Sequence, residues 1–268
     1  MIEFDVDKLD FSLGETLSCG QCFRWKPIEE NKYIGVVNKK QICITQSDGK
    51  LFFDGVTQKD CDDWFIEYLG LDEDYSAYKR ILSQDNTMKL AITYAQGIRI
   101  MKQPFWETLC SFIISQNNNI PRITEIIDRL CECFGENCDG FYSFPEAEVL
   151  AEKAPDDLAP LRSGFRARYI IDAAQKVARG EIDEAIIRNA PIDEARSVLM
   201  KIKGVGPKVA DCTMLFGAGR YEAFPVDVWM KKAMTQLFPC GLPDFAKPIA
   251  GIAQQYIFHY ARTSGEVE

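Results

Sequence analysis

The hydrophobic pattern divides the chain into two parts with different periodicities. Up to about residue 75, short runs of β-branched and aromatic residues occur at 33–37 (YIGVV), 41–46 (QICITQ) and 50–55 (KLFFDG), with NKK and SDG between them. Such runs, separated by turn residues, predict an antiparallel β-meander. By the same criterion the stretch CFRWK, residues 22–26, is expected to be a neighbouring strand.

After residue 75 the apolar positions recur with helical spacing. The expected helices span residues 107–116, 121–134, 166–180, 192–202, 207–217, 227–238 and 250–263. Their boundaries are marked by Pro121 and Pro207 in first turns, Asp227 as an N-cap, and Gly180 and Gly217 as helix ends. The predicted fold is therefore α+β, with a small antiparallel β-rich N-terminal domain (1–90) and a larger all-helical domain (91–268).

Length and composition indicate a globular protein. The chain has 268 residues, 47% of them hydrophobic, which is enough to bury a substantial core. No run of about 18 apolar residues could span a membrane. The N-terminal sequence lacks the basic and apolar regions of a signal peptide, so we expect a cytoplasmic monomer, associated with the nucleoid if the source is bacterial.

Charge is unevenly distributed along the chain. The formal net charge is −9, and residues 54–75 carry eight acids against Lys59 alone. Residues 161–180 instead carry five bases against Asp172 alone. Local charge determines what a surface attracts, so the net charge does not exclude a polyanionic partner. Both segments are also compatible with ordinary solvated helix faces.

Cysteine and histidine usage restricts the possible chemistry. The ten cysteines are expected to be mostly reduced core residues. Cys19 and Cys22 have redox-motif spacing without the βαβ context, and the cysteines at 131, 133 and 138 could bind a metal only with a fourth ligand. Because His259 is the only histidine, a His-rich metal site or a Ser-His-Asp triad is not expected. Catalysis would have to use Lys, Asp, Glu, Cys or Tyr.

The sequence KGVGPKVADC, residues 203–212, predicts a hairpin between two helices, spanning 192–217 overall. Gly204 and Gly206 permit backbone conformations that other residues resist and leave the turn N–H groups unobstructed. Such a turn before a helix can bind a phosphate. It is not a Walker A loop, because the G-x-x-x-x-G-K-[ST] spacing is missing. An ordinary αα-hairpin with a glycine turn remains the alternative.

Lys208 and Asp227 add candidate chemistry to this hairpin. Lys208 falls in the first turn of the second helix, where the helix dipole disfavours a cation and so favours the neutral amine that a nucleophile requires. Cys212 follows four residues later on the same face. A Gly- and Pro-containing loop, 218–228, then leads to Asp227. Lys208 could alternatively be a phosphate-facing cation, and Asp227 simply a helix cap.

In combination these features resemble the helix-hairpin-helix Gly/Pro-Asp superfamily of base-excision DNA glycosylases. Within it, the chain is similar to the eukaryotic-type 8-oxoguanine DNA glycosylase/AP lyases. The matching blocks, in family order, are LSCGQCFRW (17–25), SFIISQNNNIPRIT (111–124), GFRARYI (164–170), KGVGPKVADC (203–212), FPVDV (224–228) and GIAQQYIF (251–258). The resemblance covers nearly the whole chain and implies a β-rich domain beside two helical subdomains.

The resemblance implies an enzyme that flips 8-oxoguanine out of duplex DNA and removes it. Lys208 matches the lysine that attacks C1′ and forms a Schiff base, after which β-elimination nicks the strand. Asp227 matches the aspartate that stabilises the cationic transition state. Among the pocket positions, Gly20 matches the glycine whose carbonyl accepts the N7 hydrogen of 8-oxoguanine. Gln254 matches the residue that reads the Watson–Crick edge of the base.

Cys212 and Phe258 match the residues that sandwich the flipped base. The i,i+4 spacing of Gln254 and Phe258 agrees with one shared pocket.

Further DNA contacts are implied by the same resemblance. Asn117, Arg122 and Arg166 match residues that fill the vacated stack and read the orphaned cytosine, which suits double-stranded DNA with 8-oxoguanine opposite cytosine as the partner. Phe165 and Trp229 depart from the usual tyrosine and histidine at two DNA-facing positions.

The hairpin residues Lys203, Gly204 and Gly206 would contact the DNA backbone. The backbone carbonyls of Met200, Ile202 and Val205 match a monovalent-cation site. No cofactor is expected to be required.

Two other functions remain open. The chain could be a glycosylase of the same superfamily for another damaged base, such as an alkylated purine, although those enzymes generally lack the catalytic lysine. Relatives with an iron–sulfur cluster do not fit, since the C-terminal cysteine cluster is missing. The chain could instead be a non-catalytic DNA-binding module that uses the hairpin for phosphate contacts.

Overall fold

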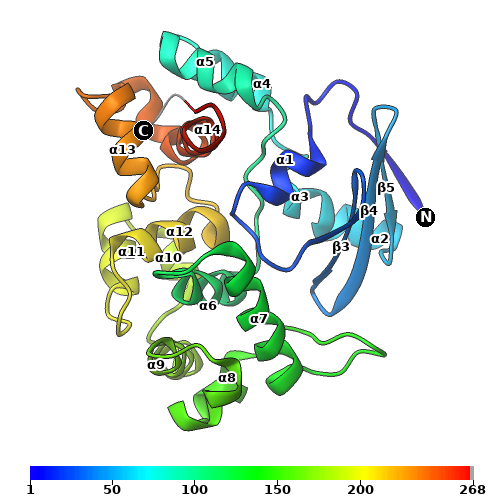
Figure 1. The fold of residues 1–268 in the computed structure, drawn as a ribbon, viewed down its shortest axis with the longest axis vertical. Helices are drawn as coiled ribbons and strands as arrows, with labels where there is room; N and C mark the ends of the chain where they lie inside the picture. The colour runs from blue at the N-terminus through cyan, green and yellow to red at the C-terminus, as the bar shows by residue number, and fades with distance from the viewer. Residues whose placement is uncertain (266–268) are drawn as a thin grey trace.

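The computed structural model describes residues 1–265 and contains a five-stranded antiparallel sheet beside a larger helical part (Figure 1). The N-terminal elements are β1 (Ile2–Asp5), α1 (Leu13–Ser18), β2 (Lys26–Glu29), β3 (Lys32–Val37), β4 (Lys40–Ser47) and β5 (Lys50–Asp54). A helical stretch follows, consisting of α2 (Gln58–Asp60), a π-helical turn (Cys61–Phe65) and α3 (Ile66–Tyr68). The α+β fold class predicted from the sequence is confirmed.

The helical part follows directly in sequence. Its elements are α4 (Tyr75–Leu82), α5 (Asn86–Tyr94), α6 (Phe105–Ser115), α7 (Ile120–Phe134), α8 (Ala147–Ala151), a 3-10 helix (Pro155–Leu161), α9 (Arg166–Ala178), α10 (Glu184–Asn189), α11 (Ile192–Leu199), α12 (Pro207–Ala218), α13 (Val228–Leu237), a second 3-10 helix (Asp244–Ile249) and α14 (Ala250–Thr263). Within residues 1–265, no helix is long and apolar enough to cross a membrane.

The sheet has the strand order β1-β5-β4-β3-β2. The predicted meander is confirmed, with Tyr33 opposite Ile44 and Ile44 opposite Phe53. The strand expected at 22–26 is wrong, because only its last residue belongs to β2. Trp25 instead turns into the core, where its indole N–H donates to the Tyr68 hydroxyl at 2.8 Å. Burial of one large aromatic residue therefore outweighs the β propensity of this stretch.

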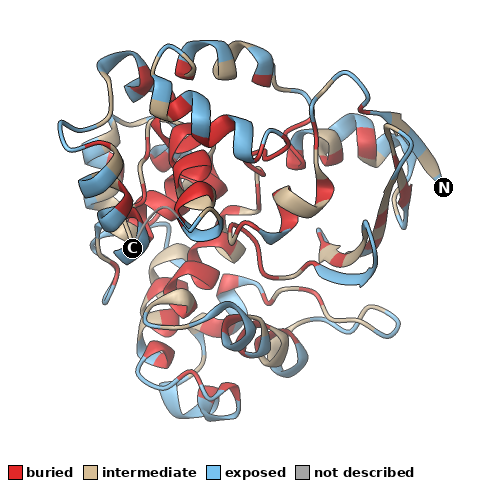
Figure 2. Cartoon of the chain, turned by 45° about the horizontal axis from the view of Figure 1, so that its top comes forward, coloured by how far each residue is buried: buried red, intermediate tan, exposed pale blue. Residues whose placement is uncertain are grey.

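The helical part has its own core, centred on α12 and α14. Both helices are almost entirely buried, and Figure 2 shows buried residues through the middle of the helices and exposed residues outside. Helix α12 packs on α6, where the Phe112 and Phe216 rings stack with centroids 5.4 Å apart. The helix end predicted at Gly217 is wrong. Helix α12 continues to Ala218 and ends where Gly219 takes φ +67°.

The change from one hydrophobic core to the other lies before Tyr75, earlier in the chain than the domain boundary predicted at residue 90. The sheet core takes side chains from Val6 to Leu71 and then Met101. Residues Tyr75 to Ala95, from α4 and α5, pack into the helical core instead. The domain boundary at residue 90 stays a prediction. The structure nevertheless places α5 against α14 and α4 against the 3-10 helix Asp244–Ile249, so the first and last parts of the helical region support each other.

Candidate active site

Lys208 lies at the start of α12, where the glycine turn ends. Gly206 is the N-cap and Pro207 the first helical residue, so the second residue points its side chain back toward α6. The Lys208 amine lies 4.9 Å from the centroid of the Phe112 ring and 3.3 Å from the Ser115 hydroxyl. Within residues 1–265 it has no carboxylate partner at ion-pair distance. The amine is thus half-buried and held between two helices, without a neutralising charge.

Asp227 begins α13, and its predicted N-cap role is confirmed. Its Oδ1 accepts the Met230 backbone N–H at 2.8 Å, which fixes the orientation of the carboxylate. Asp227 is only partly buried and lines the same cavities as Lys208. The cap therefore holds a carboxylate on the same cavities as the amine.

Two adjoining cavities contain the predicted catalytic and base-binding residues. The outer one, of about 300 Å³, is lined by Gly20, Lys208, Asp227 and Phe258, together with Trp229 and other residues. The inner one, of about 50 Å³, shares the first four and adds Cys212 and Gln254. The structure thus brings together six predicted residues from four separate segments of the chain. The inner cavity has room for only a few water molecules, so it must widen to admit a purine.

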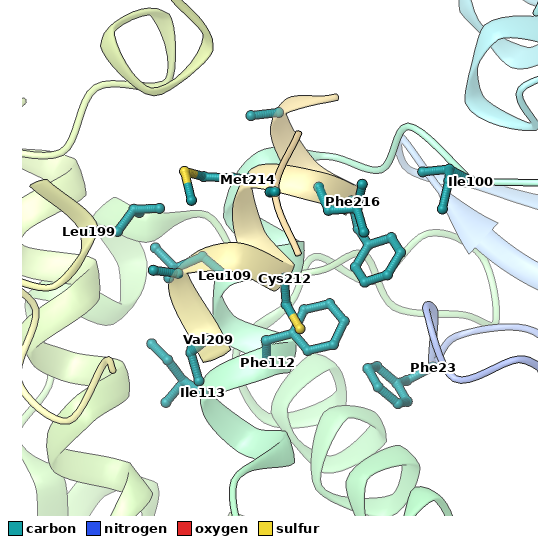
Figure 3. Close-up of a cluster of buried hydrophobic side chains, with 14 of the residues drawn as sticks. Phe23, Ile100, Leu109, Phe112, Ile113, Leu199, Val209, Cys212, Met214 and Phe216 are labelled. Atoms are coloured by element: carbon teal, nitrogen blue, oxygen red, sulfur yellow. The ribbon is translucent and has the colours of Figure 1, made fainter. Parts of the chain in front are cut away.

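Cys212 forms one wall of the inner cavity. Figure 3 shows its side chain beside the Phe112 ring, with Phe23 nearby. Burial raises the pKa of the Cys212 thiol to about 11, and the nearby Lys208 charge only partly opposes this. The thiol is therefore neutral at physiological pH and presents a soft, largely apolar surface suited to a flat ring.

Gly20 and Phe258 line both cavities. Gly20 takes φ +87°, a conformation that L side chains rarely adopt. A methyl group there would contact Phe258 at 3.9 Å, which shows how close the two residues are. The Arg262 guanidinium lies 5.2 Å from the centroid of the Phe258 ring.

Sequence reasoning missed several residues that line the cavities. Phe112 and Ser115 come from α6 and lie within the family-like block 111–124, but neither residue was singled out from it. Gln255 follows Gln254 and could have been noticed from that position. Arg262 lies one helical turn after Phe258 on α14, so the same i,i+4 spacing would have found it.

The residues predicted to contact the orphaned base lie near the start of α7 and α9. Arg166 is buried, and its guanidinium donates to the backbone carbonyls of Gln116, Asn117 and Ser163. Asn117 takes φ +48° in the loop that Arg166 holds. Burial lowers the pKa of Arg166, and the nearby Arg122 charge lowers it further. Arg122 itself is exposed.

Phe165 is 49% exposed, with its ring 5.6 Å from Tyr169 and 4.6 Å from the Arg166 guanidinium. An exposed aromatic ring that packs against neighbouring side chains in this way can insert between stacked bases as a wedge.

Side chains of α9 hold the hairpin turn in place. The Lys203 backbone N–H donates to Asp172 Oδ2 at 2.7 Å, and Lys176 donates to Oδ1 of the same carboxylate. Gly204 takes φ +79°, and a Cβ there would lie 2.3 Å from the Tyr169 ring. Gly206 does not use the conformational freedom that a glycine permits. Its φ of −106° and ψ of −177° are extended and open to any residue, and a Cβ there would meet nothing within 4 Å.

The predicted cation site and the remaining DNA-facing residue are also in this region. Met200 is partly exposed, Ile202 and Val205 are buried, and the Ile202 carbonyl accepts the Val205 N–H at 3.0 Å. Within residues 1–265, no group of three or more His, Cys, Asp or Glu could hold a metal ion. Trp229 is 43% exposed, with the Lys232 amine 5.5 Å from its ring centroid.

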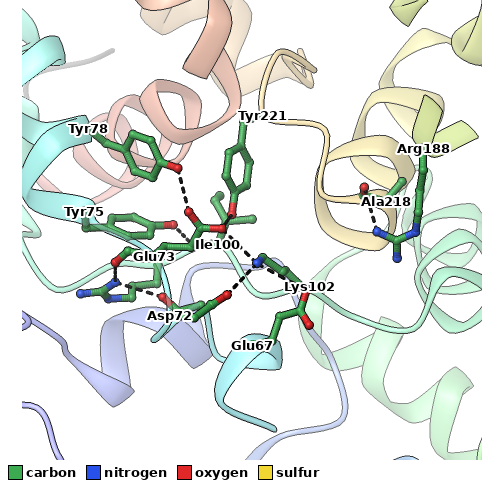
Figure 4. A network of polar contacts seen from close by, with 12 residues as sticks. Glu67, Asp72, Glu73, Tyr75, Tyr78, Ile100, Lys102, Arg188, Ala218 and Tyr221 are labelled. Carbon is green, nitrogen blue, oxygen red and sulfur yellow. Dashed lines mark hydrogen bonds and ion pairs between the residues drawn. The ribbon is translucent and has the colours of Figure 1, made fainter. Parts of the chain in front are cut away.

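A polar network supports the loop that leads to Asp227 (Figure 4). Glu73, between the sheet and α4, accepts from the Tyr78 hydroxyl at 2.7 Å, from Tyr221 at 3.2 Å and from Lys102 at 2.9 Å. Tyr221 also accepts the Gly251 N–H through its backbone carbonyl. The Asp227 loop is therefore tied both to the N-terminal region and to α14.

Two known protein families match consecutive regions of the sequence. The 8-oxoguanine DNA glycosylase N-terminal domain family matches residues 3–109, and the HhH-GPD superfamily of base excision DNA repair proteins matches residues 110–245. An N-glycosylase/DNA lyase of Saccharomyces cerevisiae is 34% identical over 85% of this chain and 68% of its own length.

Solved structures give the same picture. The 8-oxoguanine glycosylase/lyase of Clostridium acetobutylicum, in complex with DNA containing cytosine opposite 8-oxoG, superposes with a TM-score of 0.88 at 36% identity, covering 96% of this chain and 93% of that one. MBOgg1 in complex with a low affinity DNA ligand superposes with a TM-score of 0.90 at 42% identity, covering 96% and 94%. The chain therefore belongs to the HhH-GPD superfamily of base excision DNA repair proteins and, within it, to the 8-oxoguanine DNA glycosylase/lyases.

Proposed function

We propose that this protein excises 8-oxoguanine from duplex DNA with Lys208 as nucleophile and then nicks the abasic strand. The observation that carries the proposal is the pairing of the Lys208 amine and the Asp227 carboxylate on one cavity of about 300 Å³. An amine without an ion-pair partner is the group that a Schiff-base mechanism needs, and an adjacent carboxylate suits a cationic sugar.

The reaction follows from these two groups. The Lys208 nitrogen attacks C1′ of the flipped nucleotide, the bond from C1′ to the base breaks, and the electron pair leaves with the base, which is then protonated. Asp227 stabilises the positive charge that develops on the sugar. Ring opening gives a Schiff base between Lys208 and C1′. Loss of a C2′ proton then expels the 3′ phosphate, and hydrolysis of the imine releases Lys208.

The base would occupy the inner cavity after the cavity widens. Its faces would pack on Cys212 and Phe258, and Gln254 would bind its Watson–Crick edge. The Gly20 carbonyl would accept the N7 hydrogen, which 8-oxoguanine has and guanine lacks. A single acceptor placed there discriminates against the undamaged base, because guanine would leave that carbonyl facing the N7 lone pair.

DNA binding would use the surface around the cavities. The neutral backbone N–H groups of Gly204 and Gly206 would hold a backbone phosphate, which requires no net positive charge, and Lys203, whose own N–H is bound to Asp172, would contact the DNA through its side chain. Phe165 would wedge into the stack, while Asn117, Arg122 and Arg166 would fill the vacated space and read the orphaned cytosine. To read the orphaned cytosine, Arg166 would have to give up hydrogen bonds to the backbone carbonyls that it binds in this structure.

Cation binding is a finer part of the proposal. The backbone carbonyls of Met200, Ile202 and Val205 would hold a monovalent cation at the hairpin, with Trp229 on the DNA-facing side of the next loop. Support comes from the resemblance of this turn to the family pattern. The reaction itself uses only protein groups, so the cation would serve DNA binding.

The test is base release from defined duplexes. Each duplex carries one 8-oxoguanine opposite cytosine, adenine, guanine or thymine, and a parallel set carries 3-methyladenine or unmodified guanine. We expect free 8-oxoguanine and a nicked strand without alkali treatment, with cytosine as the preferred opposite base. Release of 3-methyladenine alone would replace this proposal by the alkylated-purine alternative. DNA binding without any release would indicate a non-catalytic module.

A further inference from the structure

Gln255 occupies an unusual position in the inner cavity. It lies in the middle of α14, is 4% exposed and lines the cavity beside Gln254, Cys212 and Phe258. An amide so deeply buried normally has its hydrogen-bonding groups satisfied. The amide nitrogen and the amide oxygen of Gln255 differ in whether they have a hydrogen-bond partner.

The nitrogen end of Gln255 is paired. Its Nε2 donates to Gln254 Oε1 at 2.8 Å, and both side chains are buried. This bond fixes which way the Gln254 amide faces. One lone pair of Gln254 Oε1 is engaged, and the other lone pair and the Nε2 group remain for a ligand.

The oxygen end of Gln255 has no partner. Among residues 1–265, its buried Oε1 receives no hydrogen bond from the protein. Other unpaired buried atoms exist at Arg99, Ser163 and Tyr256, but those residues do not line this cavity. A buried acceptor without a donor is unfavourable, and a ligand N–H in the cavity would satisfy it.

The flipped base offers suitable donors. A guanine-type Watson–Crick edge carries two neighbouring donors, the N1–H and the exocyclic 2-amino group. Gln254 and Gln255 both line the inner cavity, and each carries an amide oxygen able to accept one of these donors. Adenine-type bases have no 2-amino group and carry an acceptor at N1, so they would leave one of these oxygens unpaired.

We propose that Gln255 is a specificity-determining residue whose Oε1 accepts a hydrogen bond from the 2-amino group of the flipped base, while its Nε2 holds the Gln254 amide in the reading orientation. This inference rests on the proposed excision of 8-oxoguanine and adds a second amide to its recognition. It makes the 2-amino group a determinant separate from the N7 hydrogen.

The test compares two substrates that differ only in that group. One duplex carries 8-oxoguanine and the other 8-oxohypoxanthine, which lacks the 2-amino group, both opposite cytosine. A third duplex carries a preformed abasic site. Single-turnover rates are measured for wild type, Gln255→Met and Gln255→Ala. The matched control is Gln175→Met, a partly buried glutamine on α9 that bonds the Ala151 carbonyl far from the cavities.

We expect wild type to release 8-oxoguanine about tenfold faster than 8-oxohypoxanthine. Gln255→Met and Gln255→Ala should slow release of both bases, because Gln254 is no longer held, but should slow 8-oxoguanine release about tenfold more than 8-oxohypoxanthine release, with unchanged nicking of the abasic duplex. Gln175→Met should match wild type throughout. Equal losses on both bases, a loss on the abasic duplex as well, or no loss would each overturn the role of Gln255. Failure of wild type to release 8-oxoguanine would instead overturn the proposed function.

Discussion

At the scale of single residues, several positions in the site have both a structural role and a chemical role. Asp227 caps α13 and also lines the cavity beside Lys208. Gly20 takes a left-handed conformation and lines the same cavity. The Cys212 thiol, kept neutral by burial, serves as a wall and does not compete with Lys208 as a nucleophile.

Gly20→Ala tests the proposed discrimination against guanine. A methyl group fits the space, with its nearest neighbour 3.8 Å away, but φ +87° strains any L residue by ~1 kcal/mol. We expect the carbonyl to shift and the ratio of 8-oxoguanine release to guanine release to fall severalfold. The control is Gly180→Ala, which introduces similar strain at φ +71° in open space away from the cavities. An unchanged ratio in Gly20→Ala would show that this carbonyl does not select the base.

At the scale of elements, the hairpin and its support from α9 determine where Lys208 lies. The two glycines of the turn have different roles, although both look alike in the sequence. Gly204 is required by its conformation and by the nearby Tyr169 ring, while Gly206 has no local steric requirement. An open Gly206 agrees with a backbone that faces a phosphate.

Paired substitutions separate these roles. Gly204→Ala should destabilise the protein by ~2 kcal/mol or more, because the methyl group clashes with Tyr169 in a strained conformation. Gly206→Ala should leave stability unchanged, because a methyl group there meets nothing within 4 Å, and should weaken DNA binding, because the methyl group fills the open space in which the phosphate is proposed to bind. Thermal unfolding and binding to an undamaged duplex measure the two effects. Equal behaviour of the two variants would contradict the distinction.

Ionisation of Asp172, which binds the hairpin turn, makes the stability of the protein depend on pH. Burial alone would raise the pKa of Asp172, but hydrogen bonds from the Lys176 side chain and the Lys203 backbone N–H outweigh it and leave the pKa below its ordinary value. A depressed carboxyl pKa stabilises the fold above the unfolded-state pKa of about 4, and this stability is lost as pH falls through the folded-state pKa. Asp172→Asn should therefore be less stable than wild type at pH 7, with the difference shrinking below pH 4. Chemical unfolding at several pH values measures this, and a constant difference would rule out the linkage.

At the scale of the whole molecule, the sheet and the helices meet through polar contacts. Glu73 binds Tyr78, Tyr221 and Lys102 at once and so connects the N-terminal region to the Asp227 loop. Burial opposes ionisation of Glu73, but the hydrogen bonds from Tyr78 and Lys102 outweigh it and lower its pKa. The carboxylate is thus charged and fully engaged near neutral pH.

Glu73→Ala should destabilise the protein by about 2–3 kcal/mol, because it leaves Lys102 and two tyrosine hydroxyls without their shared acceptor. Glu67→Ala is the matched control. Glu67 also faces Lys102, at 3.5 Å, but is 60% exposed, so its loss should change stability by less than about 0.5 kcal/mol. Urea unfolding of both variants measures the contrast. Similar small effects would show that the network does not join the two parts.

Much of this molecule is readable from its sequence, for identifiable physical reasons. The meander and seven of the helices from residue 105 onward follow hydrophobic periodicity, and Asp227 and Pro207 mark helix starts through local chemistry. The short helices α8 and α10 are not predicted. The strand prediction at Trp25 is wrong because tertiary burial overrides β propensity. The contributions of Phe112, Ser115 and Glu73 depend on contacts between distant segments, which periodicity does not encode.

Borohydride trapping tests the central claim, that Lys208 is the nucleophile, most directly. Wild type and Lys208→Gln are incubated with a duplex carrying one 8-oxoguanine opposite cytosine, and borohydride reduces any Schiff base to a stable covalent adduct. Binding of the same duplex by Lys208→Gln is the control for a folded variant. The account predicts an adduct with wild type and none with Lys208→Gln. An adduct of equal yield with Lys208→Gln, or base release by wild type without any adduct, would contradict it.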